Sequence, residues 1–128
     1  MPERFVFDYA IVRIVPRVDR GEFLNAGVIV FCSTRGYLDC RIALDRARLN
    51  VLAPSVDIDV VETYLASIPK ICAGGSDAGD IGTLPQRARF HWLVAPRSTI
   101  IQTSDVHSGV HEDPALALDG LFEKLVRT

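Results

Sequence analysis

Cysteine is scarce in this sequence and follows no disulfide or metal-binding pattern. The three cysteines, Cys32, Cys40 and Cys72, are an odd number and include no C-x-x-C spacing. This arrangement argues against a disulfide framework and against a cysteine zinc site. We therefore expect free thiols that are buried as small hydrophobic side chains.

Long apolar runs and an excess of one charge are also missing. The longest apolar run, Ala26 to Cys32, is far too short to cross a bilayer, and the N-terminal MPERFVFDYA lacks the charged-then-apolar order of a signal peptide. We therefore expect a cytoplasmic protein with no membrane partner. The net charge of -2 gives no overall basic field, which argues against nucleic acid as the main ligand.

What the sequence contains is the composition of an ordinary globular domain. Hydrophobic residues make up 48% and charged residues 23% of its 128 residues. A chain of this length buries enough surface for one hydrophobic core. Because no linker, internal repeat or low-complexity tract divides it, we expect residues 1–128 to form a single domain.

The first part of the chain predicts a meander of three antiparallel strands. Residues 5–15 are rich in Phe, Val, Ile and Tyr and end at Pro16, which is typical of a strand. After the charged connection RVDRGEF, residues 25–32 form a second apolar strand, and residues 37–44 alternate as a third. The short connections favour pairing of consecutive strands.

Two helices are predicted after the meander. Asp45 is a candidate N-cap for a short helix. From about Asp57, apolar residues recur at three- and four-residue steps, which indicates one buried face of a longer helix. The residues of this face are Val56, Val60, Val61, Tyr64, Leu65, Ile68 and Ile71. We expect this helix to kink or restart at Pro69 and to end at Gly74-Gly75. Residues 74–88 are then expected to be a loop.

The segment around the single tryptophan predicts a hairpin. Residues 88–95 and 98–104 are expected to be two strands joined at Pro96-Arg97, where proline suits a type I turn. Alternation across the sheet would place Trp92 in the core. Residues 107–111 contain a glycine and are expected to be a loop.

Asp113-Pro114 predicts the start of a C-terminal helix, because it combines an N-cap with proline in the first turn. The full order is strands, helices, strands and a helix. This order predicts an α+β fold, in which an antiparallel sheet of about five strands has two or three helices packed on one face.

Several polar groups suggest chemistry, but none has a complete signature. Ser98 with a histidine base lacks a G-x-S-x-G elbow, and the predicted hairpin register separates His91 from Ser98 by roughly 10 Å or more. His107 and His111 lie in an expected loop, so their spacing does not indicate a metal site. The segment CAGGSDAGDIG lacks the Lys-Ser/Thr of a phosphate-binding loop. We expect no metal and no cofactor.

Arginines form the remaining candidate site. Arg13, Arg17, Arg20 and Arg97 have the guanidinium groups that bind phosphate or a partner's carboxylates in bidentate fashion. Asp19 and Glu22 lie close to three of them in sequence, so internal ion pairing is the expected use of at least some of these groups.

Three blocks of the sequence resemble the bacterial domain-of-unknown-function 3037 family (DUF3037). They are VRIVPRVDRGEFLNAGVIVF (residues 12–31), ICAGG (residues 71–75) and WLVAPRSTIIQTSDVHSG (residues 92–109). The resemblance covers nearly the whole chain. It implies no activity, cofactor or catalytic residue, so no site is carried over. It does imply a possible protein partner, a HipA-like kinase, because some members stand beside genes for such kinases.

Two functional hypotheses follow. The first is a non-enzymatic interaction or regulatory subunit, because no nucleophile, base and orienting group converge in the sequence. Its predicted binding residues are Arg17, Glu22, Asn25, Arg97, Gln102 and His107. The alternative is a small hydrolase or phosphotransfer enzyme that uses a pocket around Arg97, Ser98 and His107.

Overall fold

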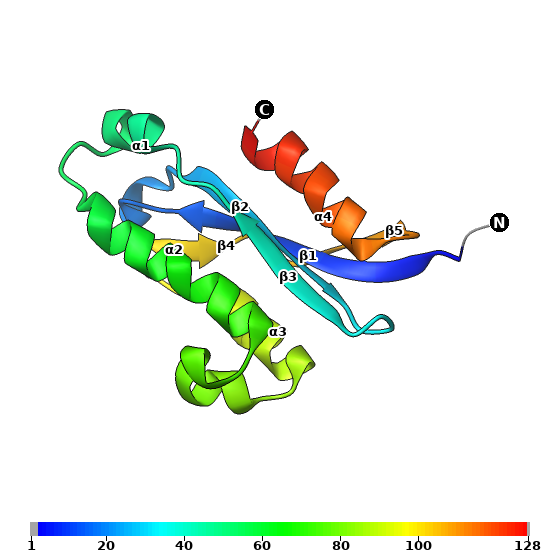
Figure 1. Cartoon of the computed structure of the whole chain (residues 1–128). Coiled ribbons are helices and arrows are strands. Elements are labelled where there is room, and N and C mark those ends of the chain that lie inside the picture. The colour runs from blue at the N-terminus through cyan, green and yellow to red at the C-terminus, as the bar shows by residue number, and fades with distance from the viewer. Residues whose placement is uncertain (1–2, 128) are drawn as a thin grey trace.

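The computed structural model describes residues 3–127, and its strands form one five-stranded antiparallel sheet (Figure 1). The strands are β1 (Phe5–Ile14), β2 (Leu24–Cys32), β3 (Tyr37–Ile42), β4 (Ile101–Thr103) and β5 (His107–His111). The order is β3-β2-β1-β4, and β5 also pairs with β1. The predicted α+β class and antiparallel sheet are confirmed.

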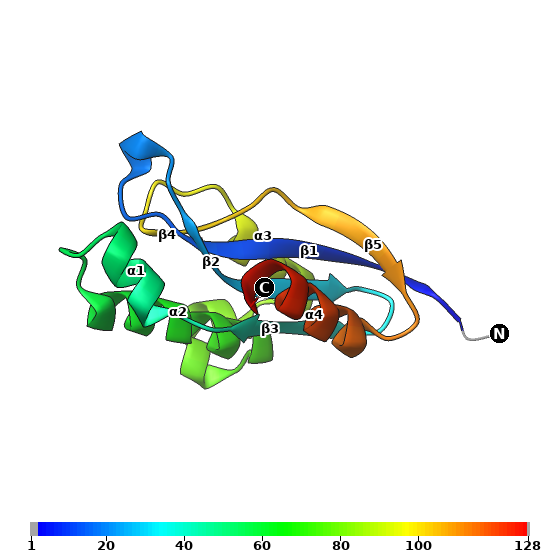
Figure 2. The same cartoon turned by 90° about the horizontal axis from the view of Figure 1, so that it is seen from above.

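Helices cover both faces of this sheet (Figures 1 and 2). They are α1 (Arg46–Leu52), α2 (Ile58–Ala73), α3 (Gln86–Val94) and α4 (Pro114–Phe122), with the 3-10 turns η1 (Val18–Arg20) and η2 (Ser76–Thr83) and the π turn η3 (Glu123–Arg127). The structure thus has more helices than the two or three predicted on one face. The physical reason is β2, which is apolar on both faces and must be covered twice.

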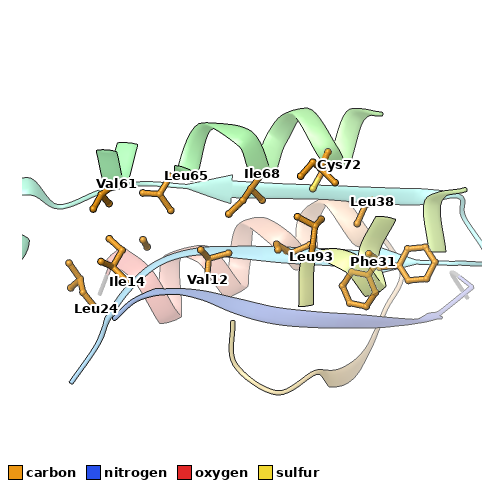
Figure 3. Packing of buried hydrophobic residues seen from close by; sticks show 14 of the residues in the cluster. Val12, Ile14, Leu24, Phe31, Leu38, Val61, Leu65, Ile68, Cys72 and Leu93 are labelled. Atoms are coloured by element: carbon orange, nitrogen blue, oxygen red, sulfur yellow. The ribbon is translucent and has the colours of Figure 1, made fainter. Parts of the chain in front are cut away.

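The alternating side chains of β2 divide the core into two clusters. Ile29 and Phe31 belong to the larger cluster, which α1, α2 and α3 cover (Figure 3). Val28 and Val30 point the other way and pack against Ala117 of α4, with its neighbour Leu118. The sheet is therefore the middle layer of three.

A bulge in β2 determines on which face of the sheet the side chains of its first residues lie. Val12 pairs with Gly27, whereas the next residue of β1, Arg13, pairs with Asn25. Ala26 is therefore the extra residue. As a result Leu24 lies in the larger cluster, while the Asn25 amide reaches the C-terminal turn on the opposite face.

The long helix has the predicted ends. The Asp57 carboxylate accepts hydrogen bonds from the amides of the first turn, and Gly74 caps the last turn with a φ of 77°. One helix continues through Pro69. Arg89 closes its C-terminus, because Nη1 donates to the carbonyl oxygens of Ile71 and Cys72, at 2.8 and 2.7 Å.

The predicted strand over residues 88–95 is wrong, because residues 88–94 belong to helix α3 and Ala95 is its C-cap. Phe90 and Leu93 are buried at a three-residue spacing, and the Phe90 ring stacks on Phe31 with centroids 5.1 Å apart. Trp92, predicted in the core, is 42% exposed. The local pattern of polar and apolar residues is compatible with the period of a strand and with that of a helix. Packing against α2 and β2 favours the helix.

The edge beyond β1 also differs from the predicted hairpin. The second strand of that hairpin, predicted over residues 98–104, is reduced to the three residues of β4. Residues 107–111 were predicted to be a loop, but they form strand β5. Both strands pair with β1, which takes the place of the missing hairpin partner. The loop predicted over residues 74–88 contains the turns of η2 and the start of α3.

Candidate functional site

Most of the predicted binding residues lie near the end of the sheet where β1 ends and β2 and β4 begin, but they line different cavities and do not form one site. Asn25 and Gln102 face Arg13 from either side in the sheet, and Arg17 and Glu22 lie in the connection between β1 and β2. His107 is separate, because it pairs with Tyr9. The strand rise places it roughly 20 Å along β1 from the level of Ile100, whose carbonyl oxygen accepts from Val15 N.

The pocket of the alternative hypothesis does not form. Arg97 and Ser98 lie before β4, which pairs with the C-terminal end of β1, whereas His107 pairs with Tyr9 in the middle of that strand. The cavity that Arg97 lines does not include Ser98 or His107. A base and a nucleophile must approach within hydrogen-bonding distance, so these residues do not make a hydrolase or phosphotransfer site.

Asn25 and Arg13 have structural contacts on the α4 face. Asn25 Nδ2 donates to the carbonyl oxygen of Leu125 at 3.0 Å, which ties β2 to the C-terminal turn. The Arg13 guanidinium lies 4.2 Å from the centroid of the Phe23 ring. Arg13 Nε and Asn25 Oδ1, a donor and an acceptor on facing residues, are buried without an internal partner.

Arg17 and Glu22 line a cavity of about 590 Å³ between the β1–β2 connection and the α1–α2 connection. Glu22 forms an ion pair with Arg20, and both side chains are about half exposed. The predicted internal pairing of an arginine in this segment is thus present. Such an exposed ion pair contributes little to stability. The remaining lining residues are Pro16, Arg20, Leu52, Ala53, Pro54, Ser55 and Val56.

A second cavity, of about 380 Å³, lies between α2, α3 and β4. Its lining residues are Tyr64, Ser67, Ile68, Trp92, Leu93, Arg97, Thr99, Ile100, Ile101, Gln102 and Thr103. We call it the aromatic groove. The buried Ile68 and Leu93 contribute apolar surface, while Tyr64 and Trp92 remain 52% and 42% exposed. Its size and apolar lining are typical of a binding site.

Arg97 holds the tryptophan of this groove in place. Its guanidinium lies 4.4 Å from the Trp92 ring centroid. Nη1 donates to the carbonyl oxygen of Leu93 at 3.0 Å, and Nη2 donates to that of Trp92. Arg97 therefore caps the C-terminus of α3, where carbonyl groups lack helical partners.

Two other polar side chains of the groove are bonded to its own backbone. Gln102 Nε2 donates to the carbonyl oxygen of Thr99 at 2.9 Å, and Thr99 Oγ1 donates to that of Ile101 at 2.8 Å. The groove therefore presents mainly apolar and aromatic surface. Of its residues, the sequence identified Arg97 and Gln102 but not the two aromatics.

The spacing of buried residues contained the signal that was missed. Phe90 and Leu93 fit a helix, and a helix that buries them turns Trp92 outward. Tyr64 was assigned to the buried stripe of α2, although its neighbour Leu65 occupies that position. With this correction, the adjacent helices α2 and α3 each carry an exposed aromatic side chain.

The Cys72 thiol does not supply a nucleophile. Cys72 of α2 forms a side-chain hydrogen bond with Cys40 of β3, and this bond and burial raise the pKa of Cys72 far above its usual range. A protonated thiol is a poor nucleophile. Among residues 3–127, no group of three His, Cys, Asp or Glu side chains is placed to hold a metal ion.

In the described part of the chain, none of the helices has the length and apolar character needed for a bilayer span. Comparisons with curated proteins and with solved structures found no match. A family model described as a protein of unknown function, DUF3037, matches residues 9–126. The chain therefore belongs to the DUF3037 family.

Proposed function

We propose that this protein is a non-enzymatic interaction subunit that acts in the bacterial cytoplasm and binds a partner protein through the aromatic groove. The observation that carries the proposal is the pair of exposed aromatics, Tyr64 and Trp92, beside a concave apolar surface. Tyrosine and tryptophan are enriched among the residues that dominate interface energies, and they act when packed against such a surface.

The groove is suited to a bulky apolar side chain of the partner. Arg97, Thr99 and Gln102 already donate to backbone carbonyl groups, so these donors do not need acceptors from a ligand. Side chains held by such bonds before binding lose less entropy when a ligand binds. The occupant we propose is a short segment that inserts one or two leucine or phenylalanine side chains between Tyr64 and Trp92.

A HipA-like kinase is the partner that family resemblance suggests, and coexpression tests it. The tagged chain and the kinase from the same genome are purified together at low salt, and their affinity is measured by calorimetry. We expect a stoichiometric complex that Trp92→Ala and Tyr64→Ala each weaken by roughly 30-fold, since truncating an aromatic anchor costs about 2 kcal/mol.

Val51→Ala is the matched control, because Val51 is 84% exposed on α1 and lies outside the groove. It should leave the affinity unchanged. A kinase that does not bind the native chain overturns the choice of partner. A complex that survives both groove substitutions overturns the groove as its site.

A further inference from the structure

Strand β5 forms an open edge of the sheet. It pairs with β1, and Figure 2 shows it at the margin of the sheet, with no strand beyond it among the described residues. Its sequence, HSGVH, has no lysine, arginine or proline, and its register with β1 has no bulge. Proteins commonly use such features to prevent an edge from pairing with another strand. β5 lacks them.

The side chains around β5 leave this edge flat and partly apolar. Val6 and Val110 face each other across β1 and β5 and are 62% and 55% exposed. On the opposite face the Phe7 ring covers Gly109, where an added Cβ would lie 2.6 Å from it. The strand is thus kept regular at its centre, while a pair of valines remains uncovered.

The sequence of β5 is complementary to itself when two copies run antiparallel. With Gly109 on the two-fold axis, His107 faces His111 of the partner subunit, and Ser108 faces Val110 of the partner subunit. The strand carries no aspartate, glutamate, lysine or arginine, so no such charges of like sign oppose each other in this pairing. The two exposed valines become diagonal neighbours across the axis, so each covers part of the other.

The His111 ring of β5 is held so that it offers a hydrogen-bond donor. His111 Nδ1 accepts a hydrogen bond from the Asp113 amide at 2.9 Å. A neutral ring bonded in this way has its proton on Nε2 and offers a donor. His107 lies beside Tyr9, with ring centroids 5.4 Å apart, on the same face of the strand. In the pairing of two copies, the ring that faces this donor is His107 of the partner subunit. An unrelated strand need not carry a side chain that accepts a hydrogen bond at that position.

We propose that two copies of this chain form a dimer through antiparallel pairing of their β5 strands, which joins the two sheets into one. Both partners use the same patch, as a two-fold interface requires. The dimer does not depend on the proposed function, because the aromatic groove is lined by residues of α2, α3 and the segment around β4 and by none of β5.

Sedimentation velocity of the full chain over a wide concentration range tests the dimer. We expect a reversible monomer–dimer equilibrium. Val110→Lys should weaken dimerisation by about tenfold or more, because two lysines then meet across the axis. Val6→Lys is the matched control, since Val6 is as exposed on the same face but lies one strand further from the edge.

His107→Lys provides a second variant on the other face of β5, in case Val110→Lys disturbs folding. Circular dichroism establishes that each variant keeps its secondary structure. A native chain that stays monomeric at all concentrations overturns the dimer. A dimer that resists both β5 variants, or that Val6→Lys weakens as strongly as they do, overturns β5 as the interface.

Discussion

At the scale of single residues, Ser104 completes hydrogen bonding at a break in the sheet edge. Its amide donates to the carbonyl oxygen of Ile11 at 2.9 Å, and its Oγ accepts from the Ile11 amide at 2.8 Å. Ser104 is 5% exposed, so no solvent replaces this acceptor easily. The side chain thus takes over one position of the ladder between β4 and β5.

Ser104→Ala should lower the free energy of unfolding by about 1–3 kcal/mol, because the Ile11 amide is left without its acceptor. Urea unfolding followed by circular dichroism measures the change. Ser98→Ala is the control, since Ser98 is exposed. Equal midpoints for the two variants would contradict this role of the Ser104 hydroxyl.

Two glycines should respond in opposite ways to the same substitution. Gly74 has a φ of 77°, and an added Cβ would lie 2.9 Å from Cζ of Arg89. Gly74→Ala should destabilise the protein by about 1–3 kcal/mol, because that conformation is costly for other residues. Gly120 is in α4 with nothing within 4 Å of an added Cβ, so Gly120→Ala should stabilise by about 0.5–1 kcal/mol.

Thermal unfolding of both glycine variants gives the comparison directly. A Gly74→Ala variant as stable as the native chain would show that the Arg89 cap of α2 tolerates a side chain at its centre.

At the scale of elements, α3 depends on a side chain that lies beyond its own end. Arg97 bonds to the carbonyl oxygens of the last turn and lies against Trp92, the single tryptophan of the chain. The fluorescence of Trp92 therefore reports on the C-terminus of α3 and on the aromatic groove together.

Arg97→Ala should increase acrylamide quenching of Trp92 fluorescence and lower the free energy of unfolding by about 1–2 kcal/mol, because it removes hydrogen bonds and a cation–π contact. Arg17→Ala removes an exposed arginine elsewhere and should change neither measurement. If acrylamide quenches Trp92 fluorescence equally in the Arg97→Ala variant and in the native chain, then Trp92 is ordered by the packing of α3 alone.

Elements with one dominant signal were predictable from the sequence. The runs of β-branched and aromatic residues in β1 and β2 favour strands alone, and Asp57 with Gly74 marks both ends of α2. The segment of α3 carries two compatible periods, so its conformation depends on contacts with Phe31 that lie far away in sequence. β5 has a glycine and one aliphatic residue, and its strand arises from pairing with β1.

The residues of the candidate site also divide into those that the sequence predicts and those that it does not. Arg97 and Gln102 stood out because of residue type, although their bonds to the backbone are structural. Trp92 and Tyr64 were assigned to the core because the period of one segment was misread and the width of the α2 stripe was overestimated. Their exposure depends on which neighbour takes the buried position, and this is decided only by tertiary packing.

At the scale of the whole molecule, the two proposed surfaces are made by different elements. The groove belongs to α2, α3 and the segment around β4, whereas the dimer edge belongs to β5. A dimer would therefore present two grooves. This makes it a bivalent binder, whose apparent affinity for a dimeric partner exceeds that of each groove.

Separate substitutions should separate these two properties. Trp92→Ala should weaken partner binding by roughly 30-fold and leave the sedimentation of the chain unchanged. Val110→Lys should weaken dimerisation and leave the affinity for a monomeric partner fragment unchanged. Calorimetry and sedimentation on the same preparations test both. A single substitution that removes both properties without unfolding would show that the surfaces are coupled.

The sheet also sets an order for folding. The β1–β2–β3 meander is local, whereas the contact of Ile11 with Ser104 spans 93 residues and that of Asp8 with Ser108 spans 100. Contacts of such separation form slowly because a long loop must close first. During synthesis, one side of β1 stays unpaired until β4 and β5 have left the ribosome. During that period the nascent chain exposes the edge of β1 that β4 and β5 later cover. A chaperone that shields this edge should raise the yield of folded protein.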